Sequence, residues 1–265
     1  MLKSERQERI LADLQRYKMV SVAELKQLFD VSEITIRRDL DDLEQEGYLH
    51  RVHGGARIVA RSHPEPPVLL RQKEQIEEKE AISAAALELI QDGDVIALES
   101  GSTTIALARK IAEKEWQNLQ IITNNFEIQK VLRNASHIQL IFIGGFVDQQ
   151  EMCTYGELAE TALKCLRVRK YFCGCRGIDP EFGRSNNIQT GFEIGTVRSF
   201  AEISDQIILL ADHTKFGLTF ALQMLPSDQI DVIITSDRTP VETLTPFEAR
   251  GIRVRIAGVE PTPAY

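Results

Sequence analysis

Three stretches within residues 1–60 carry apolar side chains at helical spacing. The first follows Ser4, the second follows Ser21, and the third runs from Ser32 to about Glu46, where Gly47 ends it. The short break "DVS" before the third stretch predicts a helix-turn-helix. The apolar positions expected on the core faces of the first two helices are Ile10, Leu11, Leu14, Val22, Leu25, Leu28 and Phe29.

The segment after the third predicted helix, "YLHRVHGGARIV", consists of two β-prone runs joined by Gly54 and Gly55. Paired glycines between such runs are typical of a β-hairpin. A hairpin in this place makes the predicted module a winged helix-turn-helix that covers residues 1–60.

The third predicted helix has an apolar face and a face that can approach DNA. Ile36, Leu40 and Leu43 fall on one arc at about 100° per residue and are expected in the core. Acidic residues further along the helix would repel phosphate, so only its N-terminal end is expected to enter a groove. The residues on the outer side of the first turns are Ile34, Thr35, Arg37 and Arg38.

Two interpretations of these arginines are open. Either Arg37 with Asp41 and Arg38 with Asp42 form i,i+4 ion pairs on an inert surface, or the arginines contact double-stranded operator DNA. The second explains the basic hairpin as well, and we favour it. The predicted DNA-binding residues are Ser32, Ile34, Thr35, Arg37, Arg38, Arg51, His53 and Arg57.

Beyond residue 75, apolar runs of four to eight residues alternate with helical segments, which predicts an α/β domain with a mainly parallel sheet. The runs begin at Val95, Leu119, Ile138, Lys170, Gln206, Asp231 and Ile252, and a helical pattern from Glu77 precedes them. Residues 61–75 include three prolines and no steady period, so they are expected to link domain 1–60 to domain 76–265.

Small and polar residues follow several of these runs, where ligands bind in α/β folds. "ESGSTT" combines a glycine with hydroxyl groups at a helix start, which favours an anion such as phosphate, and Lys215 adds a point charge. We therefore expect a phosphorylated small molecule. The predicted effector-binding residues are Ser100, Gly101, Ser102, Thr103, Thr104, Asn124, Gly144, Gly145, Asp179 and Lys215.

Composition narrows the picture. The formal net charge is −8, and residues 1–60 contribute −1, so DNA affinity must come from a local patch. No apolar run is long enough to cross a bilayer, and we expect a cytoplasmic protein. The cysteines form no Cys-x-x-Cys pair, so buried thiols are expected, with no metal site and no cofactor.

The segment "VSEITIRRDLDDLEQEGYLHRVHGGA" resembles the signature of the DeoR family of bacterial transcription regulators. The pieces "DGDVIALESGSTT", "TNN", "GID" and "LADHTKFG" are similar to its second domain, which is like ribose-5-phosphate isomerase. The resemblance implies a repressor of a sugar-utilisation operon that a phosphorylated sugar releases from its operator. Glu99 stands where the family usually has aspartate, and Glu157 where many members have proline. The DNA-contacting positions it implies are Thr35, Arg37, Arg38, Arg51, His53, Gly54 and Gly55.

Other functions remain in competition. An isomerase-type enzyme could use Asp179, Glu181, Glu193 and Lys215, but Arg176 stands where those enzymes carry the first of two aspartates, and we expect no catalysis. A second domain that serves only to oligomerise would need no polar loops. Operators with repeated half-sites require at least a dimer, so a homo-oligomer, dimer or tetramer, is expected.

Overall fold

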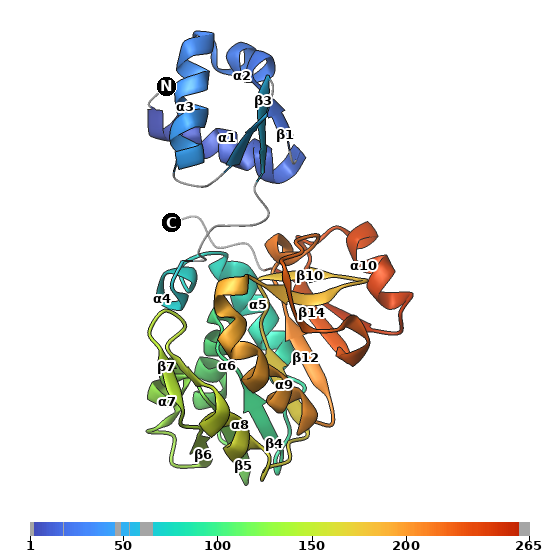
Figure 1. Cartoon of the computed structure of the whole chain (residues 1–265). Helices are drawn as coiled ribbons and strands as arrows, with labels where there is room; N and C mark the ends of the chain where they lie inside the picture. Colours follow the sequence, from blue (N-terminus) through green and yellow to red (C-terminus); the bar gives the residue numbers. More distant parts are fainter. Residues whose placement is uncertain (1–2, 18, 46–48, 53, 59–65, 260–265) are drawn as a thin grey trace. The chain divides into compact units, whose positions relative to one another are not determined.

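The computed structural model describes residues 3–17, 19–45, 49–52, 54–58 and 66–259 of the chain. The chain divides into two compact units, Met1–Glu65 and Pro66–Tyr265, which are described separately below (Figure 1).

The smaller unit is a winged helix-turn-helix, as predicted, with one additional short strand. Its elements are α1 (Lys3–Tyr17), β1 (Met19–Ser21), α2 (Val22–Phe29), α3 (Glu33–Gln45), β2 (Leu49–Val52) and β3 (Gly55–Ile58). The three strands form an antiparallel sheet in the order β1-β3-β2. Gly55 is required where β3 meets β1, because a Cβ there would lie 2.1 Å from the Val20 carbonyl oxygen.

The core of this unit confirms the predicted arc of α3 and corrects that of α2. Ile36 and Leu40 are fully buried, and Leu43 is nearly so. Leu28, expected in the core, is 57% exposed. The reason is its phase, since six residues at about 100° each turn it roughly 120° away from the buried Val22.

The larger unit is built on a seven-stranded, wholly parallel sheet in the order β15-β14-β12-β9-β4-β5-β6, which confirms the predicted α/β class. Its strands are β4 (Val95–Leu98), β5 (Leu119–Thr123), β6 (Ile138–Phe142), β9 (Lys170–Cys173), β12 (Ile207–Leu210), β14 (Val232–Ser236) and β15 (Arg253–Ala257). Its helices are α4 (Val68–Arg71), α5 (Ile76–Leu87), α6 (Ser102–Ala112), α7 (Phe126–Leu132), α8 (Glu157–Leu163), α9 (Ile194–Glu202) and α10 (Val241–Glu248).

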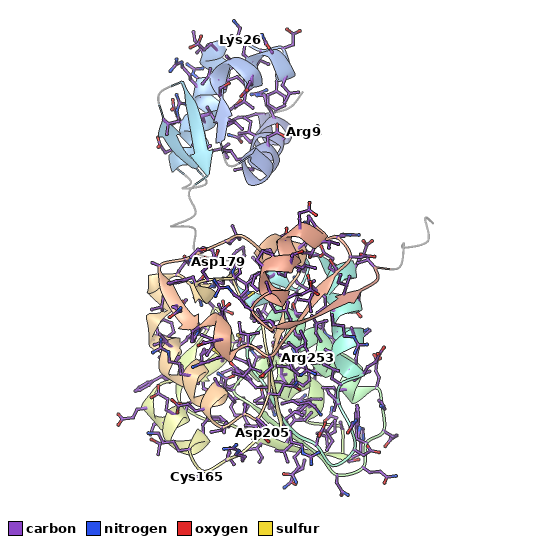
Figure 2. All side chains as sticks on the ribbon, turned by 90° about the vertical axis from the view of Figure 1, so that its right-hand side faces the viewer. Arg9, Lys26, Cys165, Asp179, Asp205 and Arg253 are labelled. Carbon is purple, nitrogen blue, oxygen red and sulfur yellow. The ribbon has the colours of Figure 1, made fainter. Side chains whose placement is uncertain are left out.

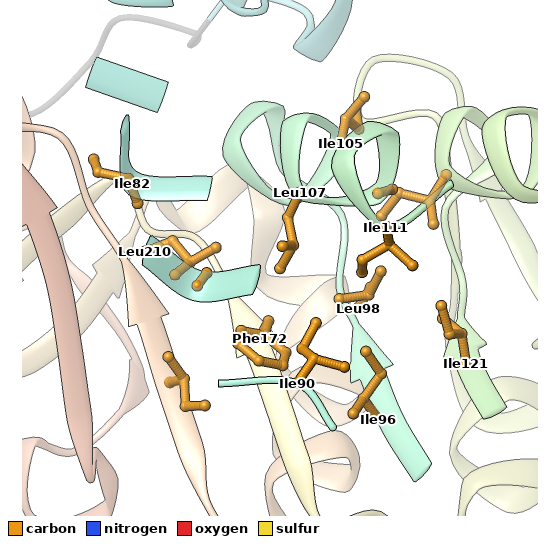
Figure 3. Packing of buried hydrophobic residues seen from close by; sticks show 14 of the residues in the cluster. Ile82, Ile90, Ile96, Leu98, Ile105, Leu107, Ile111, Ile121, Phe172 and Leu210 are labelled. Carbon is orange, nitrogen blue, oxygen red and sulfur yellow. The ribbon is translucent and has the colours of Figure 1, made fainter. Parts of the chain in front are cut away.

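Helices cover both faces of this sheet. Side chains of α5, α6 and α7 pack with Ile96 and Leu98 of β4 on one face, and Ile105, Leu107 and Ile111 of α6 are seen above them in Figure 3. Side chains of α8, α9 and α10 pack on the other face, to which β4 contributes Ala97. Alternate residues of one strand therefore enter two separate cores, as expected for a sheet buried on both sides.

Two small antiparallel sheets flank the large one. β7 (Phe146–Asp148) pairs with β8 (Cys153–Tyr155), and β10 (Gly177–Asp179) pairs with β11 (Gly183–Asn186), which also pairs with β13 (Leu222–Leu225). "GID" is thus strand β10 of a small sheet. Three short 3₁₀ helices, η1 (Ile188–Glu193), η2 (His213–Lys215) and η3 (Ser227–Gln229), complete the part of the unit that the structure describes.

The boundary between the units corrects the predicted linker 61–75. Residues 66–75 belong to the larger unit, because Val68 is fully buried in its core and Arg71 is 7% exposed. The prolines that suggested a semi-rigid connection instead precede a short helix, α4, that packs on the α/β unit.

The four cysteines differ in their exposure to solvent. Cys153 and Cys173 are buried, and burial raises the pKa of both thiols, whereas Cys175 is half-buried and Cys165 is exposed, so the expectation of buried thiols is wrong for Cys165. Within the described residues, the helices are too short or too polar to span a bilayer.

Candidate functional site

The outer side of α3 presents a basic group that is free to bind. Arg38 is exposed and has no hydrogen bond or ion pair with another described residue, and Ile34 beside it is 68% exposed. Arg37 pairs with Glu33 at 2.7 Å. Neither of the i,i+4 pairs considered from the sequence, with Asp41 or Asp42, occurs among the described contacts.

The two acidic residues in question are engaged elsewhere. Asp41 pairs with Arg51 at 3.1 Å, and Asp42 pairs with Lys3 at 2.8 Å. Their negative charges are therefore partly neutralised by other elements, and the positive charge of Arg38 faces solvent.

The predicted wing residues have different surroundings. Arg51 donates from Nη1 to the Arg37 carbonyl at 3.1 Å, and its own amide donates to Glu44 at 2.7 Å, so it holds β2 against α3. Arg57 lies in β3, although its side chain is outside the described part of the structure, as is the whole of His53. Ser32 accepts from the amide of Thr35 at 3.2 Å, and so caps α3.

A buried ion pair that sequence reasoning missed fixes α3 in place. Arg6 of α1 binds Asp39 of α3 through two hydrogen bonds, and both side chains are less than 10% exposed. The pKa of Arg6 is raised because Asp39 accepts its hydrogen bonds. Since the two residues are 33 positions apart, no local pattern in the sequence indicated the contact.

The candidate site of the larger unit follows from the order of its strands. From β4 the sheet continues to β5 and β6 on one side, and to β9, β12, β14 and β15 on the other. Ligands bind outside the carboxyl ends of parallel strands where the order reverses in this way. The loops after β4 and β9, residues 99–101 and 174–176, border that position. Asp179 lies toward one end of the unit, opposite Cys165 and Asp205, which precede strands β9 and β12 (Figure 2).

The loop after β4 leads directly into the N-terminus of α6. Gly101 is the N-cap, no side chain caps the helix, and Ser102 and Thr103 are less than 10% exposed. The amides at the start of a helix have no partner within it and attract anions. Thr104 contributes its amide only, since its hydroxyl donates to the carbonyls of Glu99 and Gly101.

Hydrogen bonds join this loop to the loop after β5 and to the loop between β7 and β8. The Ser100 hydroxyl donates to the Glu151 carbonyl at 2.8 Å and accepts from Asn125 Nδ2 at 3.0 Å. Asn125 also donates to the Glu151 carbonyl and caps α7 through the Ile128 amide. Ser100 therefore fixes the loop and has no spare donor.

Asn124 leaves one acceptor unused. Its side-chain Nδ2 donates to the Thr154 carbonyl at 2.7 Å, and its backbone carbonyl accepts from the Thr154 amide at 2.9 Å. Its Oδ1 is buried without a hydrogen-bond partner among the described residues. An unpaired buried acceptor is costly, so it marks a place where a donor from a ligand would fit.

Glu99 has a structural partner instead of a free carboxylate. Arg184 of β11 binds both of its oxygens, at 2.6 and 2.8 Å, and the Tyr171 hydroxyl donates to it as well. Burial lowers the pKa of Arg184, but the charge of Glu99, the neighbouring Cys173 and Tyr171 and the hydrogen bond to Glu99 together outweigh this effect and raise the pKa. Glu99 therefore holds β4, β9 and β11 together at the edge of the site.

Glu151 connects the site to the start of the unit. Its carboxylate pairs with Arg71 of α4 and, at 3.1 Å, with Arg176 of the loop after β9. Arg71 also donates to the Pro66 carbonyl at 2.9 Å, and the Val68 amide donates to the Gln150 carbonyl at 3.0 Å. Segment 66–71 is thus bonded to the same loop that Ser100 and Asn125 hold.

The loop that carries Lys215 is anchored to α5. The buried Glu78 carboxylate accepts from the His213 amide at 3.1 Å and contacts its ring nitrogen Nδ1 at 2.6 Å. Lys215 is half-buried in η2, and its positive charge acts on neighbouring Lys79, whose pKa is lowered chiefly by burial. The lysine therefore reaches the same region as α4 and the start of α5.

The predicted effector residues fall into two groups. The structure brings the β4 loop and Asn124 together around residues 151–155. Gly145 also lies close to this segment, as shown by the 2.5 Å that would separate an added Cβ from the Tyr155 carbonyl oxygen. Asp179 accepts from two amides in its own turn, and no described hydrogen bond joins it to the β4 loop. Gly144 is exposed, and a Cβ added there would meet no described atom within 4 Å.

Several residues at the site were absent from the sequence-based set: Arg71, Asn125, Glu151, Tyr171 and Arg184. Only Asn125 had a local signal, as the third residue of "TNN". The others meet across long stretches of sequence, as in Tyr171–Glu99 and Arg184–Glu99, which are 72 and 85 positions apart. Among the described residues, no group of three or more His, Cys, Asp or Glu side chains could hold a metal ion.

The smaller unit is a winged helix-turn-helix whose Arg38 has no partner among the described residues. The larger unit is an α/β fold with polar loops where the strand order reverses. Together these features are typical of a DNA-binding protein with a separate ligand-sensing unit. Residues 6–62 match the DeoR-like helix-turn-helix domain, and residues 74–237 match the DeoR C-terminal sensor domain. The chain belongs to the DeoR family of transcriptional regulators.

The alignments with three curated relatives cover nearly the whole length of the chain. It is 30% identical to the lactose phosphotransferase system repressor of Lactococcus lactis subsp. lactis, over 93% of this chain and 96% of that protein. It is 30% identical to the regulator GolR of Listeria innocua, over 97% and 100%, and 29% identical to the glycerol-3-phosphate regulon repressor of Escherichia coli K12, over 92% and 95%.

A weaker likeness connects the fold to an enzyme. Ribose 5-phosphate isomerase A from Methanocaldococcus jannaschii superimposes with a TM-score of 0.38 and 19% identity, over 52% of each chain. That likeness is too low to support a conclusion about activity.

Proposed function

We propose that the protein represses a carbohydrate-utilisation operon and that a phosphorylated sugar, bound to the larger unit, releases it from its operator. The observation that carries the proposal is that the uncapped α6 N-terminus and the unpaired acceptor of Asn124 follow adjacent parallel strands, β4 and β5, at the strand-order reversal. One group suits an anion and the other suits a hydroxyl, and a sugar phosphate has both. The relatives named as repressors of a lactose phosphotransferase system and of a glycerol-3-phosphate regulon support a role in the control of carbohydrate use.

In this proposal the phosphate lies at the amides of residues 102–104, with the ammonium of Lys215 as the balancing charge. Helix N-termini and lysines are common phosphate contacts, since the helix dipole and a point charge both favour a dianion. Asn124 would then accept a hydrogen bond from a hydroxyl of the sugar. Asp179 has one oxygen committed to its turn, and its second oxygen could accept from a hydroxyl only if the ligand extends to β10.

Glu151 supplies the route from this site to the DNA-binding unit. A ligand that displaces loop 148–153 changes the pairing of Glu151 with Arg71, and Arg71 is tied to Pro66, the first residue of the larger unit. The chain continues from there into the winged helix-turn-helix. A ligand shifts operator affinity only by its differential affinity for the two states, and this segment is the element whose position would differ.

Sensing fits the site better than catalysis. Arg176, which occupies the place of a catalytic aspartate in isomerases, is paired with Glu151, and Asp179 accepts two backbone hydrogen bonds. Arg176 cannot act as a base, because its guanidinium stays protonated. Asp179 is held by its own turn and is not positioned as a free base. Incubation of the protein with pentose and hexose phosphates should give no interconversion, and product formation would overturn this part of the proposal.

The experiment that tests the function is an operator titration. DNA from the region upstream of the gene is bound in a gel shift with and without a panel of sugar phosphates and the matching free sugars. We expect one phosphate to weaken binding and its unphosphorylated form to have no effect. Equal binding under all conditions would contradict the proposal. Since half-sites require two recognition helices, we also propose at least a dimer, which sedimentation of the protein–DNA complex measures.

A further inference from the structure

A second buried oxygen atom near the site has no hydrogen-bond partner among the described residues. It is Oε1 of Glu193, at the end of η1. The pKa of the Cys153 thiol is raised first by burial and next by the charge of Glu193, so the two side chains are close enough to interact electrostatically. Cys153 pairs with Asn125, and Thr154 bonds to Asn124. The residues that carry the two unpartnered oxygens, Asn124 and Glu193, therefore both lie close to the short strand β8.

The charges around Glu193 explain its protonation state. The pKa of Glu193 is raised to about 8, first by burial and then by the carboxylates of Glu151, Glu99 and Asp148, against the opposing effect of Arg176. Cys153 faces it from β8. The carboxylate of Glu160 on α8 lies close to the start of α9, since a Cβ added at Gly195 would be 2.1 Å from Glu160 Oε1. At neutral pH the carboxyl group of Glu193 is therefore mostly neutral.

We propose that Glu193 and Asn124, through their unpartnered oxygens, together bind adjacent hydroxyl groups of the effector. The inference rests on the proposed function, because it assigns the hydroxyl-binding half of the same site. Oδ1 of Asn124 accepts from one hydroxyl, and Glu193 exchanges a hydrogen bond with the next one. The site would thus take a polyhydroxylated phosphate monoester, and inorganic phosphate would occupy only the half at α6.

Ionisation of Glu193 adds a negative charge near the phosphate dianion and removes a donor. If only the neutral form binds, the apparent affinity follows the neutral fraction of Glu193. With a pKa of about 8, that fraction falls roughly tenfold between pH 7 and pH 9. The phosphate monoester is a dianion over this whole range, since its second pKa is about 6.

The experiment is calorimetric titration of the full-length protein with glucose 6-phosphate, fructose 6-phosphate, galactose 6-phosphate, ribose 5-phosphate and inorganic phosphate at pH 7 and pH 9. For the sugar phosphate that binds, we expect wild-type affinity to fall about tenfold at pH 9. Glu193→Gln keeps a neutral hydrogen-bonding group, so it should bind with little pH dependence. Glu193→Ala should bind about 3- to 10-fold more weakly at pH 7, as for one lost hydrogen bond.

The control is Glu157→Gln, which removes the same charge from an exposed position on α8 and should keep the wild-type pH profile. If Glu193→Gln has the wild-type pH profile, or if folded Glu193→Ala binds the sugar phosphate normally, Glu193 is not part of the site. If no phosphorylated compound binds the wild type, the proposed function itself fails and this inference with it. The two failures are distinct, because the first requires measurable wild-type binding.

Discussion

Arg38 is the residue on which we expect DNA recognition to depend most directly. It is exposed on the outer side of α3 and has no partner among the described residues, whereas neighbouring Arg37 is paired with Glu33. A side chain that contacts a base edge in the major groove contributes about 1–3 kcal/mol, so Arg38→Ala should weaken operator binding roughly 5- to 150-fold. The measurement is a gel-shift titration with specific and unrelated DNA.

The matched control for that prediction is Arg9→Ala on α1, an exposed arginine labelled in Figure 2. It removes the same charge from a helix other than α3. Equal losses from Arg38→Ala and Arg9→Ala would show that only net charge matters, and α3 would not be the recognition helix.

Glu99 illustrates how one buried charge depends on another. Its carboxylate is the partner of Arg184, and both side chains are less than 10% exposed. Removing one member of such a pair leaves an uncompensated buried charge, so Glu99→Gln should lower the free energy of unfolding by about 3–5 kcal/mol. Urea denaturation checks this, with the exposed Glu157→Gln expected to change stability by less than about 0.5 kcal/mol. A Glu99→Gln variant as stable as wild type would show that Arg184 finds another partner.

At the scale of elements, we expect α4 to respond to the state of the proposed effector site. Arg71 joins α4 to Glu151, and Glu151 belongs to the loop that Ser100 and Asn125 hold. Arg71→Gln should therefore leave operator binding and effector binding within about threefold of wild type but reduce the effector-induced release of DNA, since coupling of this kind is typically about 1–3 kcal/mol.

Three measurements on Arg71→Gln separate coupling from simple damage: effector affinity, operator affinity without effector, and operator affinity with it. Lys73→Gln is the control, because Lys73 is exposed and follows the same helix. Normal release of DNA by Arg71→Gln would mean that the signal reaches the smaller unit by another path.

Elements with a regular apolar pattern were predictable, and those without one were not. The arc of Ile36 and Leu40 follows from helical periodicity, and the seven parallel strands follow from continuous apolar runs, because a strand covered on both faces buries every side chain. Strand β1, with three residues, and the polar strand "GRSN" of β11 carry too few apolar positions to show a period. They form because neighbouring strands offer backbone partners, which local sequence does not reveal.

In the candidate site, too, some features were predictable from the sequence and others were not. The loops at the strand ends were predictable because parallel strands bring their carboxyl ends to one edge. The roles of Ser100, Thr104 and Glu99 were not, because their hydrogen bonds go to groups far away in sequence or to the backbone. A hydroxyl that looks available in the sequence can be fully used in the fold.

At the scale of the whole molecule, the order of the two units was predictable but their boundary was not. Prolines near residue 65 suggested a linker as far as residue 75, yet Val68 is fully buried and Arg71 forms a buried ion pair with Glu151. A fragment of residues 66–265 should therefore fold and bind the effector with the affinity of the full chain.

A fragment of residues 76–265 lacks Val68 and Arg71 and should be less stable. Loss of a buried valine costs about 1.5–3 kcal/mol, and loss of the Arg71 partner from the buried carboxylate of Glu151 adds about as much. For a domain of this size each 1 kcal/mol corresponds to roughly 2–4 °C, so the melting temperature should fall by about 10 °C relative to fragment 66–265. Calorimetry of the two fragments and the full chain measures the difference. Identical melting of the fragments would place the boundary at residue 75 and make segment 66–75 a true linker, which would also remove α4 from the route between effector and operator.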